Sequence, residues 1–245
     1  MKIDLSVVIP LYNEESNIFP IYEEIKKINF HYRVEFILVN NGSTDETKLN
    51  ISKIIESFKK SENENLFIST INLNTNVNYD GGIFEGLKVA KGEFLSWTHG
   101  DLQTPLEDVT RLFHKIKNEE KVFGKGFRTN TRGFDGIISR FHENLARKIL
   151  NKKMFEINAQ PKMFKKKYLS LFSNPPKNYT CIDTYFYYIA LINKFEIVSI
   201  DVVFKMRIYG KSKWKNNLRV FLKHILFNFL YLLKLRFNNL TKKYL

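Results

Sequence analysis

The feature that most constrains the fold of this chain is an alternation of apolar runs and helix-like segments through its first half. Four runs read as strands, at residues 5–10, 34–39, 66–73 and 94–98. Helical periodicity follows the first three runs, and Pro105 suits the first turn of a helix after the fourth. Strands that are largely apolar and separated by helices indicate an α/β fold, in which helices cover both faces of a mostly parallel, Rossmann-like sheet.

Polar motifs follow three of these strands, at the edge of the sheet where such folds bind their ligands. PLYNE ends the first strand, NNGSTD the second and HGDLQ the fourth. An ordinary strand-to-helix turn explains PLYNE as well as a ring-binding loop does. A capped helix start explains the Gly, Thr and Asp of NNGSTD, but it leaves Asn40 and Asn41 unexplained. Because all three motifs fall at the same edge, they predict a ligand site there.

The HGDLQ motif has the chemistry of a metal site. Asp101 supplies the hard carboxylate oxygen that Mg²⁺ and Mn²⁺ prefer, and such ions are usually held by one or two carboxylates together with phosphate oxygens. The imidazole of His99 suits Mn²⁺ better than Mg²⁺. A histidine bonded to backbone at a strand end explains His99 equally well. The motif predicts a divalent metal beside a phosphorylated ligand.

Charge and cysteine content narrow the class of protein. The 245 residues carry a formal net charge of +14, so nucleic acid, anionic lipid and nucleotide phosphates are all suitable partners. The aromatic residues lie mostly in apolar runs and do not alternate with basic residues, which argues against nucleic acid. Cys181 is the only cysteine, which excludes an intramolecular disulfide and fits a reducing compartment. The first ten residues read as a strand and not as a signal peptide.

The second half is less regular. Helical patterns cover residues 137–150 and 183–192, a strand pattern covers 197–204, and a long apolar helix covers 218–237. The uncharged part of this last helix is too short to span a bilayer. Its broad apolar face and basic flanks predict an amphipathic helix on an anionic membrane surface, while packing on the domain or in a homodimer is equally compatible. We therefore divide the chain into a catalytic domain, 1–213, and a C-terminal amphipathic helical extension, 214–245.

The order and spacing of the three motifs resemble the family 2 glycosyltransferases with the GT-A fold, and among them the dolichol-phosphate mannose synthase-like branch. The resemblance covers about residues 3–213. It implies that the first two motifs hold the base of a UDP- or GDP-linked sugar, and that HGDLQ holds Mg or Mn with the donor diphosphate. The base-pocket residues implied are Pro10, Tyr12, Glu14 and Asn41, and the metal-side residues are Asp101, His99 and Gln103.

Later segments continue the resemblance. GFRTNTRG implies that Arg128 contacts a phosphate, and Arg140 stands where a second phosphate-binding arginine often follows. The segment around Gln160 implies the acceptor side, and Asp183 stands where inverting members often carry a catalytic base. RIYGKSKW resembles the segment that closes over the diphosphate, which implies donor-binding roles for Arg207, Lys211 and Lys213.

Two positions depart from the family pattern. Asn40 and Asn41 replace an Asp-Asp or Asp-Asn pair, so a charge-assisted bond to the base is lost and the identity of the base stays open. His99 replaces the first Asp of the Asp-x-Asp motif and leaves Asp101 as the single carboxylate. Asp101 with diphosphate oxygens and water still provides a set of ligands for Mg²⁺ or Mn²⁺, with weaker binding expected.

We therefore expect a cytoplasmic glycosyltransferase, peripheral at the inner face of the membrane, that moves a sugar with inversion to a lipid-linked or saccharide acceptor in surface-glycan assembly. A hydroxyl acceptor requires a base such as Asp183, whereas a lipid phosphate is already anionic and requires Arg128 and Arg140 nearby. Two alternatives stay open. One is a polyprenyl-phosphate glycosyltransferase, and the other is a non-catalytic nucleotide-sugar-binding protein on the same fold.

Overall fold

The computed structural model describes residues 2–59, 64–130, 133–172, 181–207 and 218–240. In this part of the chain, one seven-stranded sheet has the order β3-β2-β1-β4-β6-β5-β7. Its strands are β1 (Leu5–Leu11), β2 (Val34–Asn41), β3 (Leu66–Leu73), β4 (Phe94–Trp97), β5 (Val122–Arg128), β6 (Lys162–Lys165) and β7 (Glu196–Val202).

Strand direction divides the sheet. β1 to β4 pair in parallel, and β5 pairs in parallel with β7. β6 runs antiparallel to both of its neighbours, β4 and β5, and so joins these two groups. Every residue of β1 and of β2 is buried, because helices cover both faces of the central strands. The expected mostly parallel α/β sheet is confirmed.

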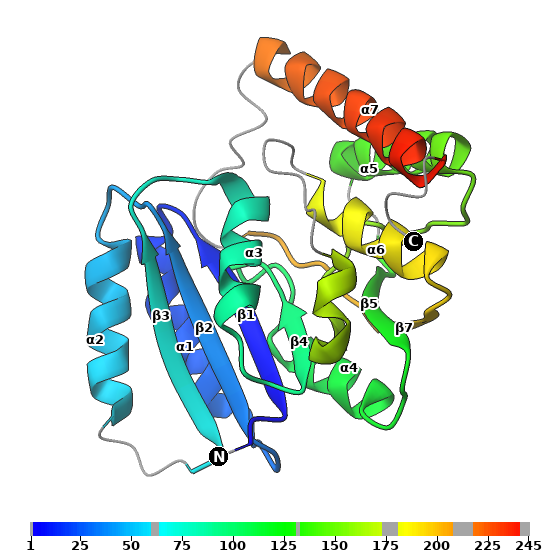
Figure 1. Cartoon of the computed structure of the whole chain (residues 1–245). Helices are drawn as coiled ribbons and strands as arrows, with labels where there is room; N and C mark the ends of the chain where they lie inside the picture. Colours follow the sequence, from blue (N-terminus) through cyan, green and yellow to red (C-terminus); the bar gives the residue numbers. More distant parts are fainter. Residues whose placement is uncertain (1, 60–63, 131–132, 173–180, 208–217, 241–245) are drawn as a thin grey trace.

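Helices form a layer on each face of the sheet (Figure 1). One buried cluster joins β1 to α1, α2 and α4, and the other joins the opposite face to α3, α5, α6 and α7. The helices are α1 (Ile18–Lys27), α2 (Thr47–Lys59), α3 (Asn78–Val89), α4 (Glu107–Ile116), α5 (Gly133–Leu150), α6 (Ile182–Ile192) and α7 (Leu218–Leu240), with short 3-10 helices at Glu15–Asn17 and Lys166–Phe172.

The C-terminal helix α7 packs on the same layer as α5 (Figure 1). Tyr231, Leu232 and Leu235 on one side of α7 belong to the core cluster that also contains α3 and α6. Residues 208–217, which include the predicted boundary at 213/214, lie outside the described residues, so the division into two parts stays a prediction. No helix in the described ranges is both long and apolar enough to cross a membrane.

The sequence missed one strand pair that matters for the site. The Gly- and Arg-rich stretch after residue 121 forms β5, and the short run at 162–165 forms β6. Neither was predicted as a strand. The pairing of β6 with both β4 and β5 is a long-range contact, and four residues carry too short a pattern to mark it in the sequence.

Candidate active site

The first two polar motifs lie against each other at the carboxyl ends of β1 and β2. The backbone N–H of Asn13 donates to the Ser43 hydroxyl at 3.1 Å, and the N–H of Thr44 donates to the Asn13 side-chain oxygen at 2.9 Å. The N–H of Glu14 donates to the Thr47 hydroxyl at 2.9 Å. The two loops therefore form one surface beside the strand ends, as the parallel sheet requires.

The predicted base-pocket residues differ in what they already contact. Asn41 is buried, and its side-chain oxygen accepts from the N–H of Val77 at 3.0 Å while its amide donates to the Asn78 carbonyl at 2.8 Å. Asn41 thus fixes the start of α3. Pro10 is also buried, whereas Tyr12 and Glu14 are half-buried on the loop after β1. Tyr12 and Glu14 are therefore the predicted base-pocket residues whose side chains keep exposed surface.

Asp101 lies at the end of β4, where a segment from the far end of the sheet meets it. Its Oδ2 accepts from Nη2 of Arg207 at 2.6 Å, and its Oδ1 accepts from the N–H of Gln103 at 3.2 Å. The Gln103 amide donates to the Lys205 carbonyl at 3.0 Å. The structure thus brings Gln103 and Arg207 to Asp101, while Lys211 and Lys213 lie outside the described residues.

The donor set around Asp101 fits a metal shared with a ligand, and not a cage made by protein alone. Among the described residues, no three His, Cys, Asp or Glu side chains converge as metal ligands. The His99 ring packs on the Tyr79 ring with centroids 5.1 Å apart, and burial lowers the pKa of His99, which favours the neutral imidazole that binds metals. One carboxylate and one imidazole suit a divalent ion whose other ligands are diphosphate oxygens and water.

Asp183 lies in the first turn of α6, and three side chains hold its buried carboxylate. The Trp97 indole N–H donates to Oδ1 at 3.1 Å, and the Gln160 amide donates to both oxygens at 3.0 Å. The ammonium of Lys162 lies 3.6 Å from Oδ1. Asp80 on α3 accepts from the Cys181 N–H at 2.7 Å and so caps the start of α6. The Asp183 carboxylate therefore already has partners on several sides.

Arg128, at the end of β5, is only 7% exposed and is only partly paired. Its Nε donates to a Glu156 carboxylate oxygen, while Nη1 and Nη2 are buried and have no hydrogen-bond partner in the described part of the chain. Its guanidinium carbon lies 5.9 Å from the centre of the Phe204 ring. Buried donors of this kind are normally satisfied, so an anion with oxygens in reach is the complementary ligand.

Comparison with known proteins identifies the family. The family model described as "Glycosyl transferase family 2" matches residues 6–188, which is more than half of the chain. The chain belongs to glycosyltransferase family 2.

Two curated relatives illustrate the likeness in sequence. A dodecaprenyl-phosphate galacturonate synthase from Rhizobium johnstonii is 29% identical over 57% of this chain and 39% of that protein. An undecaprenyl-phosphate 4-deoxy-4-formamido-L-arabinose transferase from Proteus mirabilis is 26% identical over 86% of this chain and 62% of that protein. The chain thus spans less than two thirds of the length of either relative.

Solved structures support the fold. A mannosyltransferase from Pyrobaculum calidifontis, in complex with GDP-Man and Mn²⁺, superposes with a TM-score of 0.67 at 17% identity and covers 96% of this chain and 65% of that one. A glucosyl-3-phosphoglycerate synthase from Mycobacterium tuberculosis, with Mn²⁺ and UDP, gives 0.63 at 18% identity and covers 95% and 79%. The expected glycosyltransferase family and its GT-A-like α/β fold are confirmed.

Some residues of this family 2 site were not found from the sequence. The Tyr79 ring contacts His99, and its hydroxyl accepts from the Gln160 amide at 3.4 Å, so Tyr79 joins the HGDLQ loop to the Asp183 group. Lys162 and Glu156 were also missed. A lysine at the start of a short strand gives no sign in sequence that it is fully buried. The predicted Arg140 is exposed on α5 and makes no hydrogen bond or ion pair to this group among the described residues.

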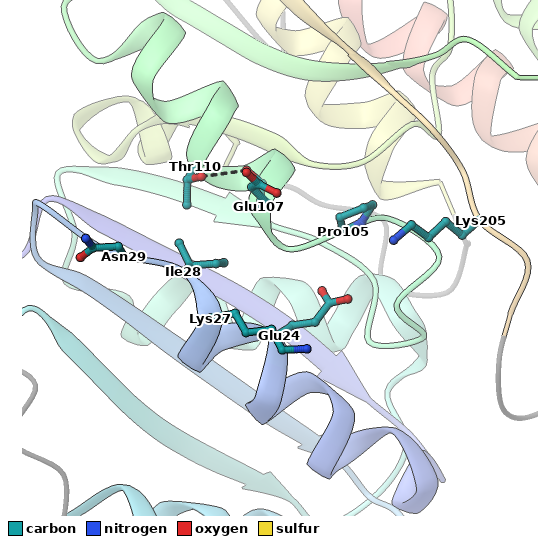
Figure 2. A pocket seen from close by; sticks show the side chains of 8 residues that line it. All are labelled: Glu24, Lys27, Ile28, Asn29, Pro105, Glu107, Thr110 and Lys205. Carbon is teal, nitrogen blue, oxygen red and sulfur yellow. Dashed lines mark hydrogen bonds between the residues drawn. The ribbon is translucent and has the colours of Figure 1, made fainter.

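A cleft of about 410 Å³ lies elsewhere, between α1 and α4 (Figure 2). It is lined by charged and polar side chains of both signs, among them Glu24, Lys27, Glu107 and Lys205. Glu24 accepts from the N–H of Leu106 at 3.1 Å and so satisfies a donor just before α4. None of the predicted site residues lines this cleft, and its mixed charge gives no preference for an anionic sugar donor.

Proposed function

We propose that this protein transfers a sugar from a nucleoside diphosphate donor to the phosphate of a polyprenyl phosphate. One observation carries the proposal: the two buried Nη atoms of Arg128 have no hydrogen-bond partner among the described residues, while the Asp183 carboxylate accepts hydrogen bonds from Trp97 and Gln160. A phosphate acceptor is already anionic, so it requires cationic donors and no base. A hydroxyl acceptor would require the reverse arrangement, with a free carboxylate. Both curated relatives compared above are named for polyprenyl phosphates.

On the donor side, the proposal assigns the base to Tyr12 and Glu14 and the diphosphate to Asp101, Gln103 and Arg207. A divalent ion bound there would neutralise charge on the leaving diphosphate. We assign Mn²⁺ in preference to Mg²⁺, because the neutral imidazole of His99 is the better ligand for Mn²⁺. Both solved relatives described above were determined with Mn²⁺. Lys211 and Lys213 are proposed to join Arg207 on the diphosphate.

The reaction follows from this placement. An acceptor phosphate oxygen, oriented by Arg128, forms a bond to the anomeric carbon as the bond from that carbon to the diphosphate breaks on the opposite face. The nucleoside diphosphate leaves, and the sugar is inverted. Arg207 moves from Asp101 toward the developing charge on the diphosphate. Asp183 accepts no proton in this scheme and instead keeps Gln160 and Trp97 in place.

The outer side of α7 gives the proposed location. Apolar side chains on this side are exposed, and Phe141 on α5 adds another; those on α7 are Leu226, Phe229, Leu230, Leu233 and Phe237. The chain as a whole is strongly cationic. Together these features support binding at the surface of an anionic leaflet, at the inner face of the membrane where polyprenyl phosphates would be presented. Flotation with anionic and with neutral vesicles tests this, and self-association measured by light scattering would instead indicate a homodimer.

In the deciding experiment, the protein is incubated with labelled UDP- and GDP-sugars and with Mn²⁺ or Mg²⁺. The acceptors compared are a short-chain polyprenyl phosphate, its dephosphorylated alcohol and a saccharide. We expect transfer to the phosphate alone. Asp183→Asn should then keep a rate within about tenfold of wild type, because a general base contributes roughly 10²- to 10⁴-fold where one is used. Transfer to the alcohol or the saccharide, with collapse in Asp183→Asn, would establish a hydroxyl acceptor. Nucleotide binding without turnover would establish a non-catalytic binding protein.

A further inference from the structure

A row of side chains crosses the sheet beneath the site. Trp97 on β4 pairs with Lys162 on β6, and Lys162 pairs in turn with Lys125 on β5. Residues directly opposite each other in antiparallel strands lie on the same face of the sheet. Trp97 and Lys162 both reach Asp183 on α6, and the Lys125 ammonium lies 5.6 Å from the centre of the Tyr187 ring, one turn further along α6.

Lys162 is fully buried, and its ammonium binds the segment that precedes β6. Nζ donates to the Ile157 carbonyl at 2.7 Å and to the Ala159 carbonyl at 2.5 Å. The same nitrogen lies 3.6 Å from Oδ1 of Asp183. One cation therefore connects two backbone carbonyls of this segment with a carboxylate on α6. Two hydrogen bonds to carbonyls and one ion pair therefore hold this buried ammonium in place.

The segment at residues 156–160 carries two functional contacts, one at each end. At its start, Glu156 accepts from Nε of Arg128. At its end, the amide of Gln160 donates to Asp183 and to Tyr79. A β-carbon placed on Gly126 would lie 2.2 Å from the Gln160 carbonyl oxygen, so β5 approaches this end of the segment as closely as the backbones allow. Small displacements of the segment would move Arg128 and Gln160 together.

We propose that Lys162 is the positioning residue of the acceptor site. By holding the carbonyls of Ile157 and Ala159 it fixes the 156–160 segment, which aims Arg128 through Glu156 and holds Asp183 through Gln160. This inference rests on the proposed function in its choice of acceptor. Its structural part, that one ammonium orders the segment, is independent of the substrate.

Protonation gives this role a distinct signature. The titratable groups that face Lys162 are Asp183 from α6, Arg128 and Lys125 from β5, Glu156 from the segment itself and His99 from the loop after β4. Burial lowers the pKa of Lys162 to about 8, with Asp183 opposing this and Arg128 lowering it further. Above that pH, Asp183 loses its counter-charge and the carbonyls lose a charged donor. Because the pKa is lowered in the folded state, the contribution of Lys162 to folding stability rises between pH 8 and 10.5, so deprotonation of Lys162 does not itself favour unfolding.

The test compares Lys162→Met with Lys125→Met. Both replacements remove a buried ammonium from the same row with a side chain of similar length. The Lys125 ammonium donates to the Gly126 carbonyl of its own strand and, among the described residues, makes no hydrogen bond to the 156–160 segment. We expect Lys162→Met to lower kcat/KM for the polyprenyl phosphate on the order of 10²-fold, as misplaced groups do, while the affinity for the nucleotide is unchanged. Lys125→Met should keep kcat/KM within a few-fold of wild type by the same reasoning.

Two further measurements separate positioning from general stability. The fall in kcat/KM above about pH 8 should be present in wild type and Lys125→Met and absent in Lys162→Met. Amide hydrogen exchange in residues 154–161, corrected for intrinsic rate, should be faster in Lys162→Met than in Lys125→Met. Equal exchange in the two variants, or equal loss of transfer, would overturn the proposal.

The exchange experiment also keeps this inference separate from the proposed function. If wild type fails to use a polyprenyl phosphate but the exchange difference is found, the proposed acceptor is wrong and the role of Lys162 in ordering the segment stands. If Lys162→Met does not fold, the exchange of the same peptide is measured in Lys125→Met between pH 7 and 9.5. A rise above about pH 8 supports the role of Lys162, and a constant corrected rate refutes it.

Discussion

The two halves of the site satisfy their polar groups in different ways. In the donor half, at the ends of β1 and β2, side chains such as Asn13, Asn41 and Thr47 bond to neighbouring loops. In the acceptor half, at the end of β5, Arg128 is buried, and among the described residues two of its nitrogens have no hydrogen-bond partner. The polar groups of the donor half are paired with one another, including Asp101 with Arg207, whereas Arg128 in the acceptor half keeps buried donors that suit an anionic substrate.

The largest expected effect is a loss of transfer from a change in the acceptor half alone. Arg128→Lys keeps a cation for Glu156 but removes the planar pair of donors, so transfer to a polyprenyl phosphate should fall on the order of 10²-fold. Nucleotide affinity should stay within about twofold by titration calorimetry. Arg147→Lys, on α5, is the matched control and should leave transfer unchanged. A parallel fall in nucleotide affinity would show that Arg128 serves both halves, which would contradict the division of the site into a donor half and an acceptor half.

The second effect breaks the donor half. Asp101→Asn removes the carboxylate proposed to bind the metal, so the Mn²⁺-dependent part of nucleotide affinity should fall about 10- to 100-fold, in line with the cost of disturbing metal ligation. Calorimetry with UDP and with GDP, each with and without Mn²⁺, measures this. Nucleotide binding that stays equally Mn²⁺-dependent in the variant would place the metal elsewhere and leave the ion pair with Arg207 as a purely structural contact.

A third change sharpens the comparison, because its two effects have opposite signs. Arg207 occupies one oxygen of Asp101, so Arg207→Ala should raise the affinity of the free protein for Mn²⁺ alone by roughly 3- to 10-fold, as expected for loss of a partly buried ion pair worth about 1 kcal/mol. The same variant should lower the affinity for nucleotide with Mn²⁺. Electron paramagnetic resonance of free Mn²⁺ reports the first effect. Lys205→Ala is the control. A fall in both affinities would contradict the proposal that Arg207 leaves Asp101 for the diphosphate.

The smallest expected effect concerns His142 on α5. Both ring nitrogens of His142 are buried and find no hydrogen-bond partner within the described ranges, and burial lowers the pKa of His142 to about 4. The unfolded chain binds a proton near pH 6.5, so stability from this residue is lost as the pH falls from 6.5 toward 4. His142→Phe should raise the free energy of unfolding by about 1 kcal/mol at neutral pH and flatten this acid loss. Urea titrations at pH 7 and 5 measure it, with the exposed His31→Gln as control; an unchanged acid slope would refute it.

The donor half was largely predictable because its signals are local. Strands β1, β2 and β4 read as apolar runs, and parallel pairing brings their carboxyl ends to one edge, which places Tyr12, Glu14 and Asp101 near each other. Even there, the sequence did not show that the Asn41 side chain already accepts a hydrogen bond from the backbone just before α3. Amide side chains serve loops and ligands equally well, so residue type alone does not separate the two roles.

The acceptor half was found only in part. Arg128, Gln160 and Asp183 were identified through a family resemblance, but their partners Glu156, Lys162 and Tyr79 were not. Each of these partners comes from a different element, and they meet because β6 inserts antiparallel between β4 and β5. A lysine that is fully buried contradicts the usual preference of this residue, so no periodic pattern marks it.

The sequence by itself determined a mostly parallel α/β sheet, a carboxylate just after its fourth strand and a basic second half, since periodicity, motif order and charge are properties of the chain. The tertiary structure decided which of those charged groups are already satisfied. Arg207 reaches Asp101 across 106 residues, Asp183 is held by Trp97 and Gln160, and two Arg128 nitrogens have no partner in the part of the chain that the structure describes. Hydrogen-bond satisfaction depends on contacts between distant segments, and those exist only once the sheet has formed.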